Sequence, residues 1–302
     1  MTGAARAEPV AVLDAVVKRF RGDTALDGLS LRVEQGEAVA LLGPNGAGKT
    51  TALSLLVGLR RPDAGVVRLF GRDPRDRAAR ARLGLTPQAS GFPATLRVDE
   101  IVRLVARHFS DPEPAGALLG RFGLGALARR QTGGLSGGEQ RRLALALAFV
   151  GRPTAVVLDE PTGFLDVEAR RLAWAGLRDY VDAGGTLLLT SHHLDEVEAL
   201  ARRVVVLSAG RVVAEDHVPA IRARAGLARI TLACDPGVVL PGVVRSEPSG
   251  SGIVLFAVDP APVLQALVAG QHSLAGLEVG RARLEEAVIA LTAADGDGGG
   301  PG

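Results

Sequence analysis

The sequence contains little cysteine and few aromatic residues, and both shortages narrow the class of protein. Cys234 is the only cysteine among 302 residues, which excludes an internal disulfide and fits a reducing compartment. Aromatic residues make up 3% of the chain and apolar residues 47%. The core must therefore consist mainly of valine, leucine and alanine, which favours an α/β fold.

Long apolar runs and an excess of one charge are also missing. No apolar run reaches the length of about 18 residues that a membrane-spanning helix needs. The first residues, MTGAARAEP, lack the pattern of a secretory signal. We therefore expect no transmembrane segment and no signal peptide, so that any membrane role depends on a partner. A formal net charge of +2 gives no electrostatic reason to expect a nucleic-acid partner.

Lysine is almost absent, which makes one glycine-rich segment conspicuous. Among 35 basic residues only Lys18 and Lys49 are lysines, and Lys49 lies in GPNGAGKTT. This segment fits the pattern G-x-x-x-x-G-K-[ST] in full, between the strand-like run 37–43 and a helical stretch. A plain glycine turn into a helix is the alternative, and the complete pattern argues against it. The predicted nucleotide-binding residues are Gly43, Pro44, Asn45, Gly46, Ala47, Gly48, Lys49, Thr50 and Thr51.

Phosphate loops of this kind bind nucleotides by a known division of labour. Glycines let backbone N–H groups converge on the phosphates, and the following helix presents its positive end. Lys49 then reaches the terminal phosphates, and the hydroxyl of Thr50 can ligate magnesium.

Two acidic residues follow another buried run, AVVLDE. Successive strand residues point to opposite faces, so Asp159 can face magnesium while Glu160 faces the attacking water. A solvated acidic pair at a strand end is the alternative. The strand-like run 185–190 is followed by His192 and His193. One of these can bind a γ-phosphate or orient water; a solvated histidine at a helix start is the alternative, which we prefer for His193.

The order of the patterned segments predicts a mostly parallel sheet that is covered by helices. Strand-like runs at 155–159, 185–190 and 203–208 alternate with helical stretches at 167–182 and 193–201. The earlier runs 13–20 and 29–35 alternate in polarity, as antiparallel strands do. The predicted domains are a disordered N-terminus (1–8), the main α/β domain (9–218) with a helical subdomain at about 94–150, a small α+β extension (219–294) and a disordered tail (295–302).

A second glycine segment, LSGGEQ (135–140), opens onto an apolar helical run. Ser136 and the amides of Gly137 and Gly138 would lie at a helix N-terminus, which is a site for an anion. Yet the chain already has a phosphate loop some ninety residues earlier.

These segments together resemble the ATP-binding cassette (ABC) ATPases over about residues 8 to 215. The resemblance is carried by the phosphate loop, LSGGEQ, VVLDEPT and TSHH, in that order. It implies a P-loop NTPase core with an antiparallel β subdomain and a helical subdomain. It also implies ATP hydrolysis by two cassettes that pair head to tail, so that each LSGGEQ segment, the family signature, caps the ATP on the other cassette's loop.

Site roles follow from the resemblance position by position. It implies that Thr50, Gln88 and Asp159 attend magnesium, that Glu160 is the general base and that His192 is the switch histidine. Gln88 also matches the loop that senses the membrane partner. The predicted ATP-binding residues added by the family are Phe20, Gln88, Ser136, Gly137, Gly138 and Asp166.

Two of these positions leave questions open. Phe20 falls where the family stacks an aromatic ring on adenine, with a core phenylalanine as the alternative. Phe164 stands where the family has glycine in the loop before Asp166, which leaves the geometry of that loop and the coupling of the two sites open.

A single cassette with the ending Leu284–Thr292 resembles the ATPase subunits of bacterial drug and antibiotic exporters. An ordinary amphipathic helix is the alternative for that ending. The resemblance implies a subunit at the cytoplasmic face of the membrane that pairs with a second cassette under a multi-span permease. The expected role is ATP-driven export of a drug, antibiotic or lipid. An importer subunit, or an ABC protein acting on nucleic acid or ribosomes, remains the alternative; the latter usually has two cassettes or long insertions, which this chain lacks.

Overall fold

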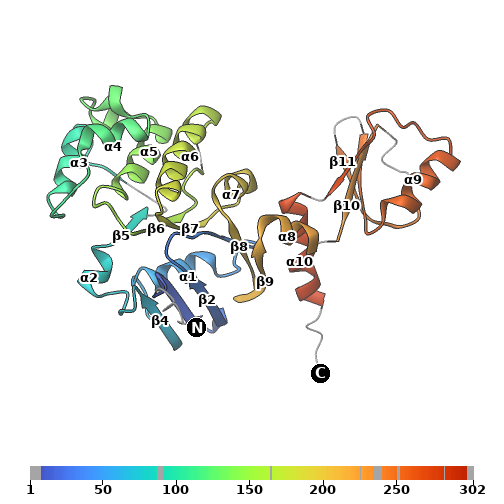
Figure 1. Cartoon of the computed structure of the whole chain (residues 1–302), viewed down its shortest axis with the longest axis horizontal. Coiled ribbons are helices and arrows are strands. Elements are labelled where there is room, and N and C mark those ends of the chain that lie inside the picture. The colour runs from blue at the N-terminus through green and yellow to red at the C-terminus, as the bar shows by residue number, and fades with distance from the viewer. Residues whose placement is uncertain are drawn as a thin grey trace, which may run out of the picture. The chain divides into compact units, whose positions relative to one another are not determined.

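The computed structural model describes residues 8–86, 91–163, 165–224, 226–233, 240–249, 252–281 and 283–297. The chain forms two compact units, residues 1–215 and 216–302, coloured from blue to gold and from gold to red in Figure 1. The division falls after residue 215, whereas the sequence placed it after 218. Residues 1–7 of the expected N-terminal tail lie outside the described part of the chain.

The larger unit contains a three-stranded antiparallel sheet near the N-terminus. Its order is β2-β1-β4, formed by β1 (Ala11–Phe20), β2 (Asp23–Val33) and β4 (Ala64–Leu69). Alternate residues of β2 are buried, from Leu29 through Leu31 to Val33. The alternation of apolar and polar residues therefore gives one face to the core and one to solvent, as the sequence predicted.

The second sheet of this unit has six strands in the order β5-β6-β7-β3-β8-β9. The four pairs β5–β6, β6–β7, β7–β3 and β3–β8 are parallel. Every residue of β3, β6 and β7 is buried, because these runs of valine, leucine and alanine are covered on both faces. The strands are β3 (Ala38–Leu42), β5 (Leu83–Thr86), β6 (Ala155–Asp159), β7 (Thr186–Thr190), β8 (Arg203–Ser208) and β9 (Arg211–His217).

Helices follow the ends of these strands, as expected for a P-loop fold. α1 (Lys49–Leu56) follows β3, α6 (Val167–Asp182) follows β6, and α7 (Leu194–Leu200) follows β7. A short α2 (Arg77–Arg80) precedes β5. Because β6 and β3 both pair with β7, the carboxyl ends of three strands meet at one edge of the sheet, where α/β proteins bind their ligands.

The segment between β5 and β6 is helical. It contains α3 (Val98–Ala106), α4 (Ala115–Arg121) and α5 (Gly137–Leu147), with 3₁₀ turns at Gly125–Leu127 and Thr132–Gly134. No strand occurs in its described residues 91–154. The α/β fold with a parallel core, an antiparallel β part and a helical part is thus confirmed.

The smaller unit is an antiparallel sheet with the order β11-β12-β10-β13. One face packs α9 into a core that includes Ile230, Leu255, Val263 and Leu267. The elements are α8 (Val218–Arg224), β10 (Ala228–Leu232), β11 (Val243–Ser249), β12 (Gly252–Ala257), α9 (Pro260–Ala269), β13 (Glu278–Arg281) and α10 (Leu284–Asp297).

Three features of this unit differ from the sequence analysis. β11 was not predicted, because VVRSEPS is polar and contains proline; it lies at the edge of the sheet, where proline is tolerated. α8 was not predicted either. The expectation that residues 295–302 are disordered was wrong for 295–297, which continue α10 to Asp297. Cys234 and residues 298–302 lie outside the described part of the chain.

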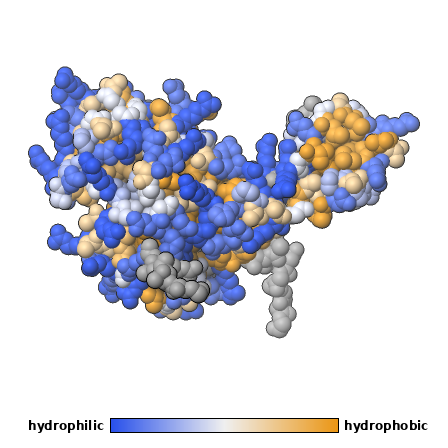
Figure 2. Space-filling model, viewed as in Figure 1, coloured by the Kyte–Doolittle hydropathy of each residue, from blue (hydrophilic) through white to orange (hydrophobic). Residues whose placement is uncertain are grey.

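The surfaces of the two units differ in character. On the face drawn in Figure 2, apolar residues gather on part of the smaller unit, whereas hydrophilic residues predominate over the larger one. Exposed large apolar side chains of the smaller unit include Val244, Val258, Val268, Leu274 and Val279. None of the helices in the described residues combines the length and the hydropathy needed to cross a bilayer.

Candidate active site

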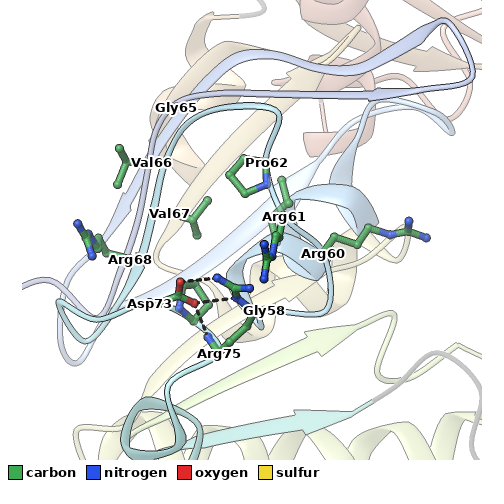
Figure 3. Close-up of a pocket in the computed structure, with 12 residues that line it drawn as sticks. Gly58, Arg60, Arg61, Pro62, Gly65, Val66, Val67, Arg68, Asp73 and Arg75 are labelled. Carbon is green, nitrogen blue, oxygen red and sulfur yellow. Dashed lines mark hydrogen bonds and ion pairs between the residues drawn. The ribbon is translucent and has the colours of Figure 1, made fainter.

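Two cavities of the larger unit differ sharply in what lines them. One, of about 230 Å³, is bordered by Arg60, Arg61, Arg68 and Arg75 (Figure 3). Its acidic residue, Asp73, accepts hydrogen bonds from the Arg75 side chain, which lower the pKa of Asp73 to about 2. None of the residues predicted from the sequence lines this cavity, so it is not the candidate site.

The other cavity, of about 340 Å³, lies where β3 and β6 end and α1 begins. It collects residues from the phosphate loop together with Asp159, the last residue of β6, and Glu160, which follows it. Its lining is Ala25, Asn45, Gly46, Ala47, Gly48, Lys49, Thr50, Thr51, Asp159 and Glu160. All but Ala25 were predicted. Ala25 carries no chemical signal in the sequence, because its place in the wall comes from the fold of β2.

The shape of the phosphate loop depends on glycine. Gly43 and Gly48 have φ angles of +143° and +100°, a region that other residues rarely adopt. A Cβ at Gly48 would lie 2.5 Å from the carbonyl oxygen of Ala25. At this position the loop therefore also passes too close to β2 for a side chain. Gly48 is the N-cap of α1, and the first amides of that helix are left available for an anion at the cavity.

Lys49 is held inside this loop. Its ammonium group donates to the carbonyl oxygens of Gly43 at 2.7 Å and Pro44 at 3.0 Å. Partial burial lowers the pKa of Lys49, and the charges of Glu160 and Asp159 oppose that shift. The ammonium therefore sits at the loop with its own backbone partners and faces the place where terminal phosphates would bind.

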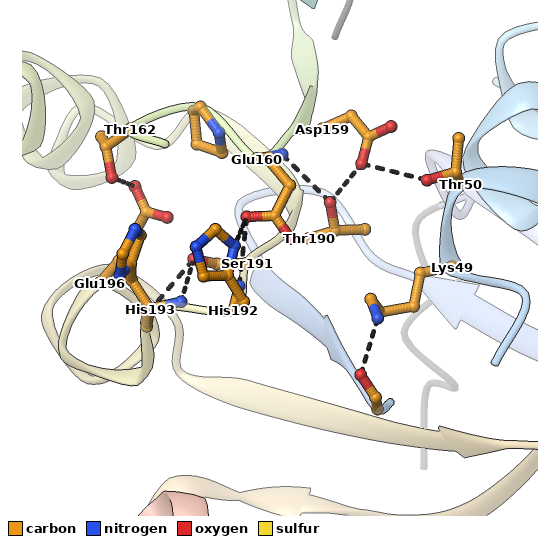
Figure 4. A network of polar contacts seen from close by, with 12 residues as sticks. Lys49, Thr50, Asp159, Glu160, Thr162, Thr190, Ser191, His192, His193 and Glu196 are labelled. Carbon is orange, nitrogen blue, oxygen red and sulfur yellow. Dashed lines mark hydrogen bonds and ion pairs between the residues drawn. The ribbon is translucent and has the colours of Figure 1, made fainter. Parts of the chain in front are cut away.

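Thr50 and Asp159 bring two oxygen atoms together beside Lys49 (Figure 4). The Thr50 hydroxyl lies 3.5 Å from Oδ1 of Asp159, which also accepts a 2.6 Å hydrogen bond from the hydroxyl of Thr190. A hydroxyl and a carboxylate are hard oxygen donors of the type that magnesium prefers. In the described residues no cluster of three or more His, Cys, Asp or Glu side chains could hold a metal alone. The donors therefore fit an ion that also takes phosphate oxygens.

Glu160 and His192 form a close pair (Figure 4). Oε2 of Glu160 lies 2.5 Å from Nδ1 of His192 and accepts a second hydrogen bond from the His192 backbone N–H at 3.2 Å. A ring that donates from Nδ1 has Nε2 free as an acceptor when neutral and as a donor when protonated. His193 is the residue at the N-cap position of α7, where its side chain makes no capping hydrogen bond, and burial lowers its pKa.

Three residues of the site's surroundings were missed by the sequence analysis: Thr190, Arg141 and Glu196. Thr190 is fully buried and binds Asp159. Arg141 donates to carbonyl oxygens of the segment that follows β6. Threonine and arginine are too common in strands and helices to stand out. The only available signal was a glutamate, Glu196, on the apolar face of a short helix.

Glu196 is fully buried beneath the segment that follows Glu160. Its Oε1 accepts hydrogen bonds from the Thr162 hydroxyl at 2.7 Å and from the Trp174 indole at 3.2 Å. Burial raises the pKa of this carboxyl, while hydrogen bonds from Ser191, Thr162 and Trp174 oppose the shift. Glu196 thus joins the segments that follow β6 and β7.

The second glycine segment lies at the start of α5, away from this cavity. Ser136 is the N-cap, and its hydroxyl accepts from the Glu139 backbone at 3.2 Å while Glu139 accepts from the Ser136 backbone N–H at 2.7 Å. Gly137 is exposed and a Cβ there would meet open space, whereas Gly138 is half-buried and a Cβ there would lie 3.6 Å from the Leu165 side chain. None of the three lines the cavity of the phosphate loop.

The remaining predicted residues have separate surroundings. Asp166 is exposed and caps α6 by accepting from the Ala169 backbone at 2.7 Å. Phe20 ends β1, is partly exposed, and has the Arg60 guanidinium carbon 4.8 Å from its ring centre. It does not line the cavity. Gln88 and Phe164 lie outside the described residues.

Comparison with known proteins gives these features a context. The family described as ABC transporter matches residues 26–163, which include the phosphate loop and the segment after β6. A Nod factor export ATP-binding protein I of Burkholderia thailandensis is 40% identical over 290 residues, which cover 92% of this chain and 95% of that protein. The protein of the same name from Paraburkholderia xenovorans is 39% identical over 263 residues, covering 83% and 86%.

Solved structures agree with these relatives. The ATP-binding subunit of an ABC transporter matches 72% of this chain and 93% of its own with a TM-score of 0.65 and 26% identity. A dimeric ATP-binding cassette with ADP and Pi matches 68% of this chain with a TM-score of 0.62 and, at 24% identity, supports the fold alone. This chain therefore belongs to the ABC transporter family as an ATPase subunit, in the group whose curated members are named for export.

Proposed function

We propose that this chain powers the export of a small molecule through a separate multi-span permease, as one of two cassettes that hydrolyse ATP. The observation that carries the proposal is the 40% identity to an export ATP-binding protein over 92% of the chain, which includes the smaller unit. The relatives reported above give no support to an importer or to a protein that acts on nucleic acid or ribosomes.

The roles of the residues follow from their positions around the cavity. The loop amides and Lys49 hold the phosphates of ATP, and Glu160 accepts a proton from the attacking water. The oxygen of that water bonds to the γ-phosphorus as the bond to the bridging oxygen breaks, so that ADP and inorganic phosphate leave. His192 orients the Glu160 carboxylate through the hydrogen bonds that they share.

Magnesium fits the oxygen donors of Thr50 and Asp159. Thr50 and Asp159 would hold the ion, together with Gln88 as the family resemblance implies. The ion would neutralise charge on the β- and γ-phosphates. Thr190 keeps the Asp159 carboxylate in place through its 2.6 Å hydrogen bond, so the orientation of this carboxylate does not depend on the ion.

The position of Ser136, Gly137 and Gly138 supports a head-to-tail pair. They lie at the start of α5, where Ser136 and Gly137 are exposed, and none of the three lines the cavity of its own chain. A second cassette, either another copy or a homologue, would place its ATP against them, while this chain's ATP lies against the partner's equivalent segment. Asp166 and its loop would face the same partner, and Phe20 would stack on adenine.

The names of the relatives give only a general indication of the compound that this chain helps to transport. The Burkholderia protein is named for Nod factor export, and for this chain we propose a drug, antibiotic or lipid. Purification of the tagged chain in mild detergent should recover one or two proteins with about six apolar spans each. Recovery of ribosomal or DNA-bound proteins without a membrane protein would refute the transport role.

Replacement of the general base tests the chemistry. Glu160→Gln should lower ATP turnover by about 10²–10⁴-fold, because the amide cannot accept the proton, while ATP binding stays within about twofold of the parent. Glu278→Gln, at an exposed residue of the smaller unit, is the control for loss of one negative charge. Normal turnover by Glu160→Gln would show that Glu160 is not the base.

A further inference from the structure

One arginine joins the start of the signature helix to the catalytic segment. Arg141 lies in α5, and its guanidinium donates to three successive carbonyl oxygens at the end of β6. Nη2 lies 2.8 Å from Asp159 O and 2.6 Å from Glu160 O, and Nε lies 3.1 Å from Pro161 O. A planar guanidinium with five N–H groups can bind several acceptors at once, which an ammonium at one point cannot do.

The backbone that Arg141 binds is strained. Glu160 has a φ angle of +50°, a left-handed conformation that is unfavourable for a residue with a Cβ and persists only where its surroundings hold it. On the N–H side, Glu160 donates to the carbonyl oxygen of Thr190 at 3.1 Å and to its hydroxyl at 3.2 Å. On the carbonyl side, the Glu160 oxygen accepts from Nη2 of Arg141 at 2.6 Å and, more weakly, from the Gly163 backbone N–H at 3.4 Å.

The same helix begins at the signature segment. Ser136 caps α5, and Arg141 follows five residues later, about 7.5 Å along the axis of a continuous helix. Within this distance a helix moves as a rigid body, so a displacement of Ser136 and its neighbours also moves Arg141. The next residue, Arg142, donates to the carbonyl oxygens of Phe122 and Gly123 and thus ties α5 to the end of α4.

We propose that Arg141 is a positioning residue for Glu160 and that it couples the signature segment to the general base of its own chain. The inference rests on the proposed head-to-tail pair. In that pair, the signature segment contacts the partner's ATP, whereas Glu160 acts on the ATP of its own loop. Arg141 therefore connects two nucleotides in different sites, and binding of ATP at one site positions the base at the other.

A matched pair of variants tests the positioning role. Arg141→Lys keeps the charge but cannot span three carbonyl oxygens, so kcat should fall by about 100-fold, as small misplacements of catalytic groups do. The affinity for a fluorescent ATP analogue should stay within about twofold, because no phosphate ligand is lost. Arg142→Lys makes the same change one residue later and away from Glu160, and its kcat should stay within about twofold of the parent.

Cooperativity tests the coupling between the sites. The Hill coefficient for ATP turnover should fall towards 1 in Arg141→Lys and stay at the parent value in Arg142→Lys. In a double-mutant cycle with Ser136→Ala, the effects of Arg141→Lys and Ser136→Ala on kcat should be strongly non-additive, whereas those of Arg142→Lys and Ser136→Ala should add. A purely structural loss would lower the melting temperature and leave the Hill coefficient unchanged.

The possible results distinguish a failure of the role proposed for Arg141 from a failure of the proposed function. Parent values of kcat and Hill coefficient in Arg141→Lys, with Glu160→Gln inactive, would overturn the role of Arg141 alone. An equal loss of kcat in both lysine variants would overturn it as well, because a general disturbance of α5, and not the hydrogen bonds from Arg141 to the three carbonyl oxygens, would then explain the loss. Full turnover by Glu160→Gln would instead overturn the proposed base. If Arg141→Lys does not fold, Arg141→Gln, which keeps an N–H donor, takes its place in the same assays.

Discussion

The hydroxyl of Thr190 offers a direct test of how the site is assembled. It donates to Oδ1 of Asp159 at 2.6 Å and accepts from the Glu160 backbone at 3.2 Å, and the residue is fully buried. Thr190→Val replaces this hydroxyl by a methyl group of similar size. The change therefore removes the hydrogen bonds without opening a cavity. It is not a conservative substitution, because the lost hydroxyl binds Asp159 and Glu160.

The size of the effect follows from the partners of that hydroxyl. A hydrogen bond to a charged group contributes about 1.5–3 kcal/mol to stability. The Glu160 N–H still donates to the carbonyl oxygen of Thr190 at 3.1 Å in the variant. Loss of the hydroxyl as its second acceptor therefore adds little to the destabilisation. At about 2–4 °C per kcal/mol for a unit of this size, the melting temperature should fall by roughly 3–12 °C. Asp159 also loses its orienting partner, so turnover should require a higher magnesium concentration.

Calorimetry and ATP turnover at varied magnesium measure the two effects, with Thr190→Ser as the control. Serine keeps the hydroxyl and loses one buried methyl, which costs about 1 kcal/mol and leaves the magnesium dependence unchanged. A parent-like melting temperature and magnesium dependence in Thr190→Val would refute the argument. So would a shift in magnesium dependence for Thr190→Ser as large as that for Thr190→Val.

Two further predictions concern residues on either side of the site. Burial raises the pKa of Glu196 from 4.5, so the native state binds its proton more tightly than the unfolded state; stability is full below pH 4.5 and falls as the pH rises through the higher native pKa. Glu196→Gln should remove that loss, and melting temperatures that fall in parallel from pH 5 to 8 would contradict this. Gly48→Ala places a Cβ 2.5 Å from Ala25 O at a φ angle of +100°, and it should weaken binding of a fluorescent ATP analogue by about tenfold or more. Gly116→Ala, at an exposed position of α4 where a Cβ meets open space, should keep the parent's ATP affinity; an equal loss in both variants would contradict the role of the loop's shape.

The sequence was most informative where chemistry and periodicity coincide. The phosphate loop, the acidic pair after β6 and the histidines after β7 were located because each follows an apolar run that became a buried strand. Edge strand β11 was missed because its polar, proline-containing sequence is indistinguishable from a loop until a neighbouring strand is known. The same limit applies to Ala25, whose contribution to the cavity comes from position and not from side-chain chemistry.

By itself, the sequence determined the fold class, the order of the main elements of the larger unit and the residues proposed to bind a nucleotide, because these depend on local patterns and on side-chain type. Only the tertiary structure decided how those residues are held. Thr190, Arg141 and Glu196 are distant in sequence from the residues they bind. Their hydrogen bonds exist only because β6 and β7 pair, α5 packs against β5 and α6, and α6 packs against α7. The left-handed backbone of Glu160 is likewise invisible in the sequence, since a strained conformation of a residue with a Cβ depends on the contacts that enforce it.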